Sequence, residues 1–362
     1  MDDTNDLSIM CNEAAMHVRL PQPSFSVRVW NKSPHAFLIK AAKLTRIGSG
    51  LPAYYNDEVI IPAMMSRGVS LEDARTYNII GCVEPQAHGK TDGWHDAAFF
   101  NMCRPLELVF SNGMEGGEQV GPRTGEISDF RTFDDFYNAY KVQMDYFIKL
   151  LVNADNSIDV AHAERCPLPF QSCMIDDCIG KGQSLQEGGA IYNFTGPQGF
   201  GIANVADSLM AVKTLVYDQH KLTLAEYKDA IDNNFGHGLS VQKCTEVTEG
   251  IMKEMLEKGH PVDVADASRI CQAVYKSSIE NADKAHYDKI LEMIKEVPKY
   301  GNDLEDVDLF ARDVAYTYTK PLEKYKNPRG GQYQAGLYPV SANVPLGAQT
   351  GATPDGRLAN TP

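Results

Sequence analysis

The chain has 362 residues, and its 34 basic and 48 acidic side chains give a formal net charge of −14. This balance argues against nucleic acid or an anionic membrane as partner, because both require a basic surface. The acidic first residues lack the features of a signal peptide, and no apolar run approaches the roughly 20 residues of a membrane helix. Eight irregularly spaced cysteines favour a reducing, cytoplasmic compartment over a secreted disulfide scaffold.

Helices alternate with short strands along the whole chain. Apolar periodicity and capping residues predict helices at residues 7–19, 34–47, 101–112, 133–154, 203–219, 224–234, 283–297 and 304–325. Alternating apolar residues predict strands at residues 25–30, 77–81, 192–194 and 332–343. The segment 236–277 is polar and helical, which is typical of an excursion at the surface. This order favours an α/β barrel or a layered α/β fold.

One stretch carries the strongest chemical signal. An apolar run at residues 79–81 leads to Cys82 and Glu84, and Pro85 follows directly. Proline donates no backbone hydrogen bond and restricts the residue before it, so we expect Pro85 to end any regular element here. Residues two apart in an extended segment point to the same side, so the thiol and the carboxylate can face one cavity. The stretch is a candidate reaction centre.

Other clusters carry less chemical information. Cys173 and Cys178 lack a Cys-x-x-Cys or His-x3-His partner, so buried free thiols are favoured over a metal site. The glycine-rich run 196–201 lacks the endings and spacings of nucleotide-binding loops, and residues 351–356 form a turn cluster. We therefore expect the chain to bind no metal and no cofactor of its own.

Residues 79–86 and 93–101 together resemble the cysteine loop of the glycyl radical enzymes, the pyruvate formate-lyase-like family. Further matches lie in the expected order at residues 162–165, 188–199 and 350–357. The resemblance implies part of a ten-stranded α/β barrel, with residues 1–362 forming one partial barrel domain. The Arg-Val-Ala-Gly-Tyr-like loop that carries the radical glycine in this family is absent. We therefore expect an internal part of a longer enzyme, without the first half of the barrel and the glycyl radical domain, and inactive by itself.

The resemblance also implies roles for individual residues. Cys82 would be the thiyl site, and its thiol should stay protonated because hydrogen-atom transfer needs the S–H bond. Glu84 would be the general base that deprotonates a substrate hydroxyl. Asp96 would bind the diol, as in the glycerol and 1,2-propanediol dehydratases, with His95 orienting or protonating the departing hydroxyl. Tyr338 either lines the pocket wall or is a core tyrosine with a satisfied hydroxyl. For His162, Glu164 and Arg165 a structural network of ion pairs and hydrogen bonds is expected.

The implied activity is that of a radical lyase of anaerobic metabolism, a B12-independent dehydratase of glycerol or propane-1,2-diol. Its glycyl radical would lie on the separate domain and be installed by a radical-SAM activating enzyme. The full-length enzyme would be a homodimer with a small-molecule substrate.

Several alternatives remain open. Isethionate sulfite-lyase and hydroxyproline dehydratase would need other polar groups, largely from the absent half of the barrel. Formate acetyltransferase-type chemistry uses two adjacent cysteines and is disfavoured, since Cys82 lies between Gly81 and Val83. Choline is disfavoured because His95 and Phe99 stand where choline-cleaving relatives have threonine and tyrosine. A truncated, non-catalytic chain is the alternative outside this class.

Overall fold

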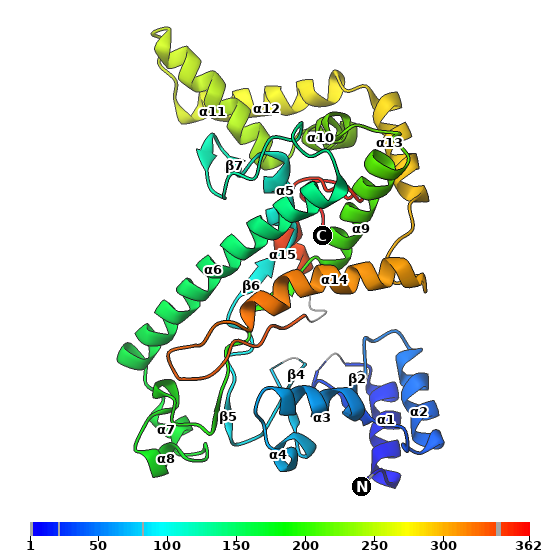
Figure 1. Cartoon of the computed structure of the whole chain (residues 1–362), viewed down its shortest axis with the longest axis vertical. Helices are drawn as coiled ribbons and strands as arrows, with labels where there is room; N and C mark the ends of the chain where they lie inside the picture. The colour runs from blue at the N-terminus through cyan, green and yellow to red at the C-terminus, as the bar shows by residue number, and fades with distance from the viewer. Residues whose placement is uncertain (1–2, 21, 82, 338–341) are drawn as a thin grey trace. The chain divides into compact units, whose positions relative to one another are not determined.

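The computed structural model describes residues 3–20, 22–81, 83–337 and 342–362 and divides the chain into two compact units. The first unit comprises Met1–His95, Ile158–Thr195 and Lys326–Gln332. The second comprises Asp96–Ser157, Gly196–Tyr325 and Tyr333–Pro362. Each unit mixes helices with pairs of short strands (Figure 1).

The first unit is built on parallel strand pairs and short helices. Its helices are α1 (Asp6–Val18), α2 (His35–Thr45), α3 (Asp57–Ser66), α4 (Leu71–Arg75), α7 (Pro169–Ser172), α8 (Cys178–Lys181) and the 3₁₀ turn η1 (Leu185–Glu187). Its strands are β1 (Ser26–Val29), β2 (Ala53–Asn56), β3 (Asn78–Ile80), β4 (Glu84–Gln86), β5 (Thr91–Asp92) and β9 (Tyr192–Asn193). β1 pairs with β2 and β5 with β9 in parallel, whereas β3 and β4 form an antiparallel hairpin. Parallel neighbours joined through helices are the α/β pattern that the sequence predicts.

One buried cluster and one ion pair fix the elements around the β3–β4 hairpin. Tyr55, Tyr77 and Phe194 are buried together in this cluster. Arg28 of β1 donates two hydrogen bonds of 2.9 Å to the carboxylate of Asp57, at the start of α3. Its guanidinium also lies 3.9 Å from the centre of the Tyr77 ring. Because Tyr77 directly precedes β3, these contacts fix where the hairpin begins.

The second unit is mostly helical. Its helices are α5 (Cys103–Phe110), α6 (Phe133–Arg165, within this unit as far as Ser157), α9 (Ile202–Val212), the π-helical η2 (Lys213–Asp218), α10 (Leu224–Asp232), the 3₁₀ turn η3 (Asn234–Gly236), α11 (Val241–Glu257), α12 (Val264–Glu280), α13 (Lys284–Glu296), α14 (Glu305–Leu322) and α15 (Asn343–Ala348). Its strands are β6 (Phe99–Asn101), β7 (Met114–Glu115), β8 (Glu118–Gln119) and β10 (Gln198–Phe200). β6 and β10 pair in parallel, which brings Phe99 opposite Gln198.

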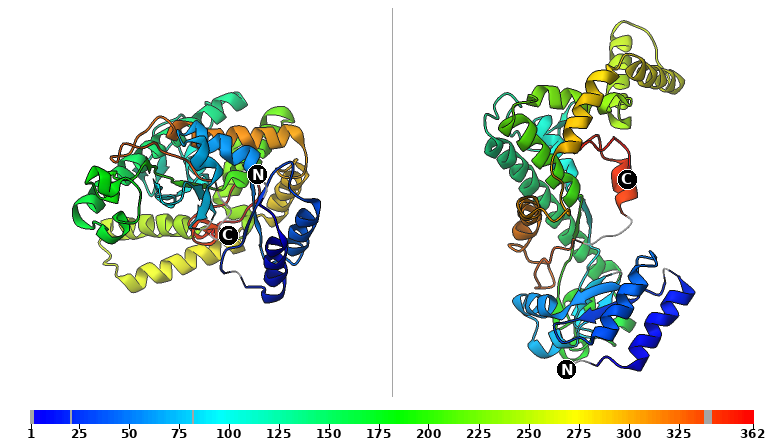
Figure 2. Two further views of the ribbon diagram at one scale, coloured as in Figure 1. Left: turned by 90° about the horizontal axis from the view of Figure 1, so that it is seen from below. Right: turned by 90° about the vertical axis from the view of Figure 1, so that its right-hand side faces the viewer.

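Aromatic side chains hold the core of the second unit. The buried Phe136 of α6 packs edge-on against Phe110 and Phe130. Phe310 of α14 contacts Phe133 of the same helix α6, and α14 also packs against α9. The predicted excursion is confirmed as helical: α11 and α12 pack against each other as a hairpin that projects from the rest of this unit (Figure 2). Ser240 and Asp263 cap the N-termini of the two helices, as their residue types favour.

Two predicted secondary-structure elements differ from the structure. Among the described residues of the expected strand 332–343, Gly336 bridges to Gln198 and Gln332 bridges to Lys326 without a continuous strand, and α15 begins at the end of the segment. Residues 338–341 lie outside the described ranges. Glycines at 330, 331 and 336 offer no side chain to pack on a pleated surface, which weakens a strand.

The second wrong prediction concerns the end of α6. The helix continues to Arg165, well past the expected end at residue 154. Glu164 and Arg165 are exposed, and among the described residues no ion pair joins them to each other or to His162. Basic residues in a last helical turn interact favourably with the helix dipole, which stabilises the longer helix without the expected network.

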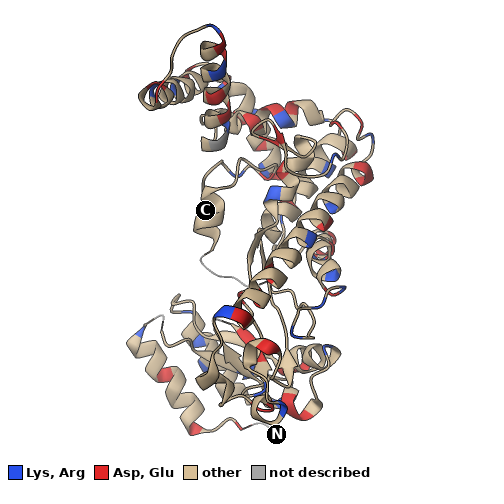
Figure 3. Ribbon diagram, turned by 90° about the vertical axis from the view of Figure 1, so that its left-hand side faces the viewer, with Lys and Arg blue, Asp and Glu red and all other residues tan. Residues whose placement is uncertain are grey.

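Charges are spread over both units. Figure 3 shows acidic and basic residues mixed along the helices, as the balance of 34 basic and 48 acidic residues implies. In the described part of the chain, no helix is both long and apolar enough to cross a membrane.

Candidate active site

The β3–β4 hairpin lies where the sequence predicts the reaction centre. Ile80 pairs with Glu84, and Ile79 pairs with Pro85. Pro85 therefore does not end the regular structure, contrary to the prediction. A two-stranded sheet consists of edge strands, where the missing N–H of proline is tolerated. Cys82 lies outside the described residues, so its role stays a prediction.

Glu84 is fully buried, although glutamate is usually exposed. The backbone N–H of Val83 donates to its Oε2 at 2.9 Å. The hydroxyl of Tyr55 donates to the carbonyl of Val83 at 3.0 Å, and burial together with the Glu84 charge raises the pKa of that tyrosine. The carboxylate is thus turned back onto its own loop and held in place, as a positioned base requires.

Gly81 makes room for this carboxylate. Its φ of +58° is a left-handed conformation, and a Cβ there would come within 2.6 Å of Oε2 of Glu84. Both observations favour glycine at this position.

We expect Gly81→Ala to cost roughly 1–2 kcal/mol of unfolding free energy and to displace the Glu84 carboxylate. Gly68→Ala is the matched control, because Gly68 has a φ of +89° but a Cβ there would meet no atom within 4 Å. Urea denaturation of both variants should show the larger loss for Gly81→Ala. Equal losses of unfolding free energy would mean that the contact with Glu84 adds nothing to the cost of a side chain at position 81.

His95, the last residue of the first unit, carries a neutral imidazole at pH 7. Burial lowers its pKa to about 4, the positive charge of Arg329 adds to this, and Glu84 opposes it. Its Nε2 lies 3.2 Å from Oε1 of Gln86, and a side chain at position 93 would overlap the ring. The residue can therefore orient a hydroxyl group, but near neutral pH it holds no imidazolium proton to give.

The pH dependence of stability follows from this lowered pKa. The unfolded chain takes up a proton on His95 near pH 6.5, whereas the folded chain does so only near pH 4. The neutral His95 therefore contributes its full share of the unfolding free energy above pH 6.5, and this contribution is lost as the pH falls towards about 4. We expect the unfolding free energy of His95→Gln, measured against that of the parent chain, to change by up to about 3 kcal/mol between pH 7 and pH 4. A constant difference across this range would contradict a neutral His95 in the folded chain.

Asp96 belongs to the second unit, where β6 and β10 fix its partner. Its carboxylate accepts a hydrogen bond from Nε2 of Gln198, a buried residue that opens β10. The backbone N–H of Gln198 donates to the carbonyl of Ala98 at 2.8 Å. Tyr338 lies outside the described ranges, so its role stays a prediction. Glu84 and His95 belong to the first unit and Asp96 to the second.

Sequence reasoning missed the two amides that contact these side chains, Gln86 and Gln198. Gln86 had a signal, since it lies two residues after Glu84 and so shares its strand face. Gln198 lies within the matched segment 188–199, but it is 102 residues from Asp96, so no local pattern links the two side chains.

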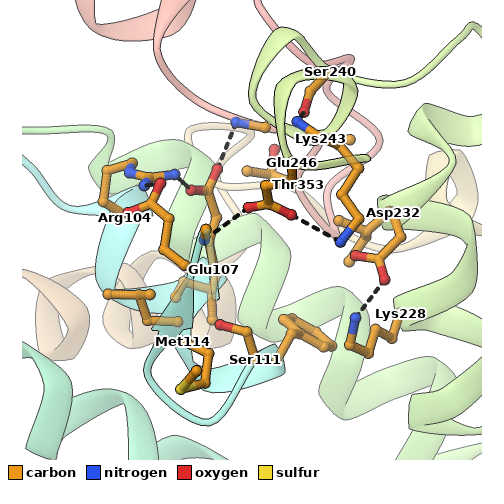
Figure 4. A pocket seen from close by; sticks show the side chains of 18 of the residues that line it. Arg104, Glu107, Ser111, Met114, Lys228, Asp232, Ser240, Lys243, Glu246 and Thr353 are labelled. Atoms are coloured by element: carbon orange, nitrogen blue, oxygen red, sulfur yellow. Dashed lines mark hydrogen bonds and ion pairs between the residues drawn. The ribbon is translucent and has the colours of Figure 1, made fainter. Parts of the chain in front are cut away.

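A pocket of about 310 Å³ lies within the second unit (Figure 4). Its charged groups pair with one another: Arg104 contacts Glu107 and Glu115, Lys228 contacts Asp232, and Lys243 lies 3.1 Å from Glu246. Backbone N–H groups of Gly351 and Gly116 donate to Glu107 and Glu246 at 2.6 and 3.0 Å. Glu84, His95 and Asp96 do not line this pocket, so the pocket contains none of these candidate catalytic or substrate-binding residues.

The cysteines and acidic residues form no metal-binding cluster within the described ranges. Cys178 is buried, as expected for a free thiol, whereas Cys173 is exposed, contrary to the expectation. Cys173 follows directly after the four-residue helix α7, whose exposed Phe170 shows that little of this segment packs inward.

Comparison with known proteins places the chain in a family. The model of the pyruvate formate lyase-like family matches residues 1–347. The (2S)-3-sulfopropanediol dehydratase of Klebsiella oxytoca is 33% identical over 98% of this chain and 38% of its own length.

Solved structures agree with this match. A structure describing 1,2-propanediol dehydration in Roseburia inulinivorans has 59% identity and a TM-score of 0.91, covering 100% of this chain and 43% of that one. The B12-independent glycerol dehydratase of Clostridium butyricum has 50% identity and a TM-score of 0.82, covering 100% and 40%. The chain thus spans about two fifths of the length of these relatives and has the α/β barrel fold of their family in that part. It belongs to the pyruvate formate lyase-like family of glycyl radical enzymes.

Proposed function

We propose that the protein of which this chain forms part is a radical dehydratase of a small diol, glycerol or propane-1,2-diol. The observation that carries the proposal is the buried, positioned carboxylate of Glu84 two residues after Cys82. Identity of 59% and 50% to structures concerned with propanediol and glycerol dehydration supports this substrate class.

In the proposed reaction Cys82, as a thiyl radical, takes a hydrogen atom from the hydroxyl-bearing C1 of the diol. Glu84 accepts the proton of the C1 hydroxyl, and the resulting radical anion expels the hydroxyl on C2. One proton leaves with that hydroxyl as water, which balances the proton that Glu84 accepted. The product radical recovers its hydrogen atom from Cys82 and becomes the aldehyde. A carboxylate suffices as base because a hydroxyalkyl radical is far more acidic than its parent alcohol.

The remaining predicted residues would hold the substrate. Asp96 would accept hydrogen bonds from the diol, with Gln198 fixing its orientation. His95, neutral at pH 7, would orient the departing hydroxyl, and the proton for the water would return from Glu84. Tyr338 would complete the pocket wall.

The radical and the partner proteins are also proposals. A glycyl radical elsewhere in the full-length protein would supply the hydrogen-atom abstraction that activates Cys82. A radical-SAM enzyme would install it, and the active form would be a homodimer in an anaerobic cytoplasm. Of the described residues, Glu84, His95 and Asp96 would contact the substrate.

The test is an anaerobic assay of the activated full-length protein on glycerol and propane-1,2-diol, following aldehyde formation. We expect turnover with at least one diol and none with Cys82→Ala at equal radical content. Absence of turnover with both diols in a radical-loaded preparation would refute the proposal.

A second candidate is dehydration of a substituted substrate. The 33% identity to a (2S)-3-sulfopropanediol dehydratase and 30% identity to a trans-4-hydroxy-L-proline dehydratase favour it. Adding both compounds and isethionate to the same assay ranks the alternatives by kcat/KM.

A further inference from the structure

Arg329 is the most completely hydrogen-bonded charge that the described residues contain within the first unit. Its side chain is 1% exposed. Its Nε donates to both carboxylate oxygens of Asp159 at 3.1 and 2.9 Å. Its Nη2 donates to the carbonyl of Phe194 at 2.8 Å and to the hydroxyl of Thr195 at 3.0 Å. Nε and Nη2 therefore hold the guanidinium to the end of α6 and to the segment after β9.

The other side of the same guanidinium holds the segment that leads to His95. Nη1 donates to the backbone carbonyl of Asp92 at 3.1 Å and to its carboxylate at 2.7 Å. The guanidinium carbon lies 5.3 Å from the centre of the Trp94 ring, within the range of a cation–π contact. Arg329 thus contacts two of the three residues that precede His95.

The segment needs such an anchor because its backbone is strained. Trp94 has a φ of +36°, a left-handed conformation that is unfavourable for a bulky residue. Its ring lies 5.1 Å from the imidazole of His162, and a Cβ at Gly93 would overlap the His95 ring. A strained backbone persists only where surrounding contacts determine it, and Arg329 supplies three of these.

We propose that Arg329 is a positioning residue of the active site, which fixes residues 92–94 and through them the His95 imidazole. The inference rests on the proposed function, since it gives the His95 imidazole its task. The planar guanidinium binds Asp159 through Nε and Asp92 through Nη1, whereas a lysine has its three donors on a single nitrogen. Burial is the main cause of the lowered pKa of His95, and the positive charge of Arg329 lowers this pKa further, whereas Glu84 raises it.

The test uses the full chain in a Trp30→Phe background, which leaves Trp94 as its single tryptophan. Arg329→Lys keeps the charge and removes the planar guanidinium. Arg312→Lys is the matched control, because Arg312 is exposed and its ion pair is with the neighbouring Asp313. We expect Arg329→Lys to raise acrylamide quenching of Trp94 at least about twofold, and the control to leave it unchanged.

A second measurement uses the activated full-length protein. Misplacing a group by about 1 Å can cost on the order of a hundredfold in rate, so we expect kcat with a diol to fall at least tenfold in Arg329→Lys at equal radical content. KM should change less than kcat. Asp92→Asn, which weakens only the link to the His95 segment, should show smaller changes of the same kind and serves if Arg329→Lys does not fold.

Two outcomes would overturn the proposal. The first is unchanged Trp94 quenching in a folded Arg329→Lys or Asp92→Asn chain. The second is a lowered melting temperature with unaltered kcat, which would make Arg329 a purely structural residue. If the parent protein dehydrates no diol, the kinetic measurement fails for the parent as well, whereas the Trp94 measurement still reports on Arg329.

Discussion

Replacing Glu84 with glutamine is expected to lower kcat of the activated full-length protein by about 10³-fold, within the range for loss of a positioned general acid or base. The amide has the shape of the carboxylate and can still accept the hydrogen bond from the Val83 N–H. It cannot accept the proton of the substrate hydroxyl, so C–O cleavage would have to start from a neutral radical. Aldehyde formation at saturating diol measures the loss.

The control for this substitution is Glu72→Gln, since Glu72 is an exposed carboxylate in the first turn of α4. It should leave kcat unchanged. Electron paramagnetic resonance should find equal radical content in both variants, which separates a defect in the base from a defect in activation. A kcat for Glu84→Gln within threefold of the parent value would exclude Glu84 as the base.

Local sequence signals predicted the helices well, because their determinants are local. Caps and apolar spacing placed α13 and α14 close to their observed bounds. The strands were harder to predict, since a strand forms only with a partner strand, which its own sequence does not identify. The described residues of 332–343 form only single bridges, whereas Pro85 pairs with Ile79 in β4 because proline is tolerated in an edge strand.

The residues of the candidate site could be proposed from the sequence because their signal is also local. Glu84, His95 and Asp96 lie in one continuous stretch, so a motif could indicate them together. Arg329 could not be found in this way, because it lies 237 residues from Asp92 and 170 from Asp159. Only folding of the first unit brings the three side chains together, and no local pattern records that contact.

The largest expected effect on stability is that of Asp159→Ala. Asp159 is 2% exposed and its partner Arg329 1%, so removing the carboxylate leaves a buried guanidinium with fewer partners. Breaking a buried ion pair from one side costs about 3–5 kcal/mol, and we expect the lower end because Asp92 still pairs with Arg329. Asp159→Asn should cost less, since its amide oxygen can still accept from Nε. Urea denaturation followed by Trp94 fluorescence in the Trp30→Phe background reports the unfolding of this unit.

Glu13→Ala is the control for this comparison. Glu13 pairs with Lys40 at 2.5 Å, but its side chain is 50% exposed, so its removal should leave the urea midpoint unchanged. If Asp159→Ala also left the midpoint unchanged, the buried ion pair would contribute nothing net to the fold. In that case the contacts of Arg329 with Asp92, Phe194 and Thr195 would suffice to hold it, and its retention would be explained by the positioning of His95 alone.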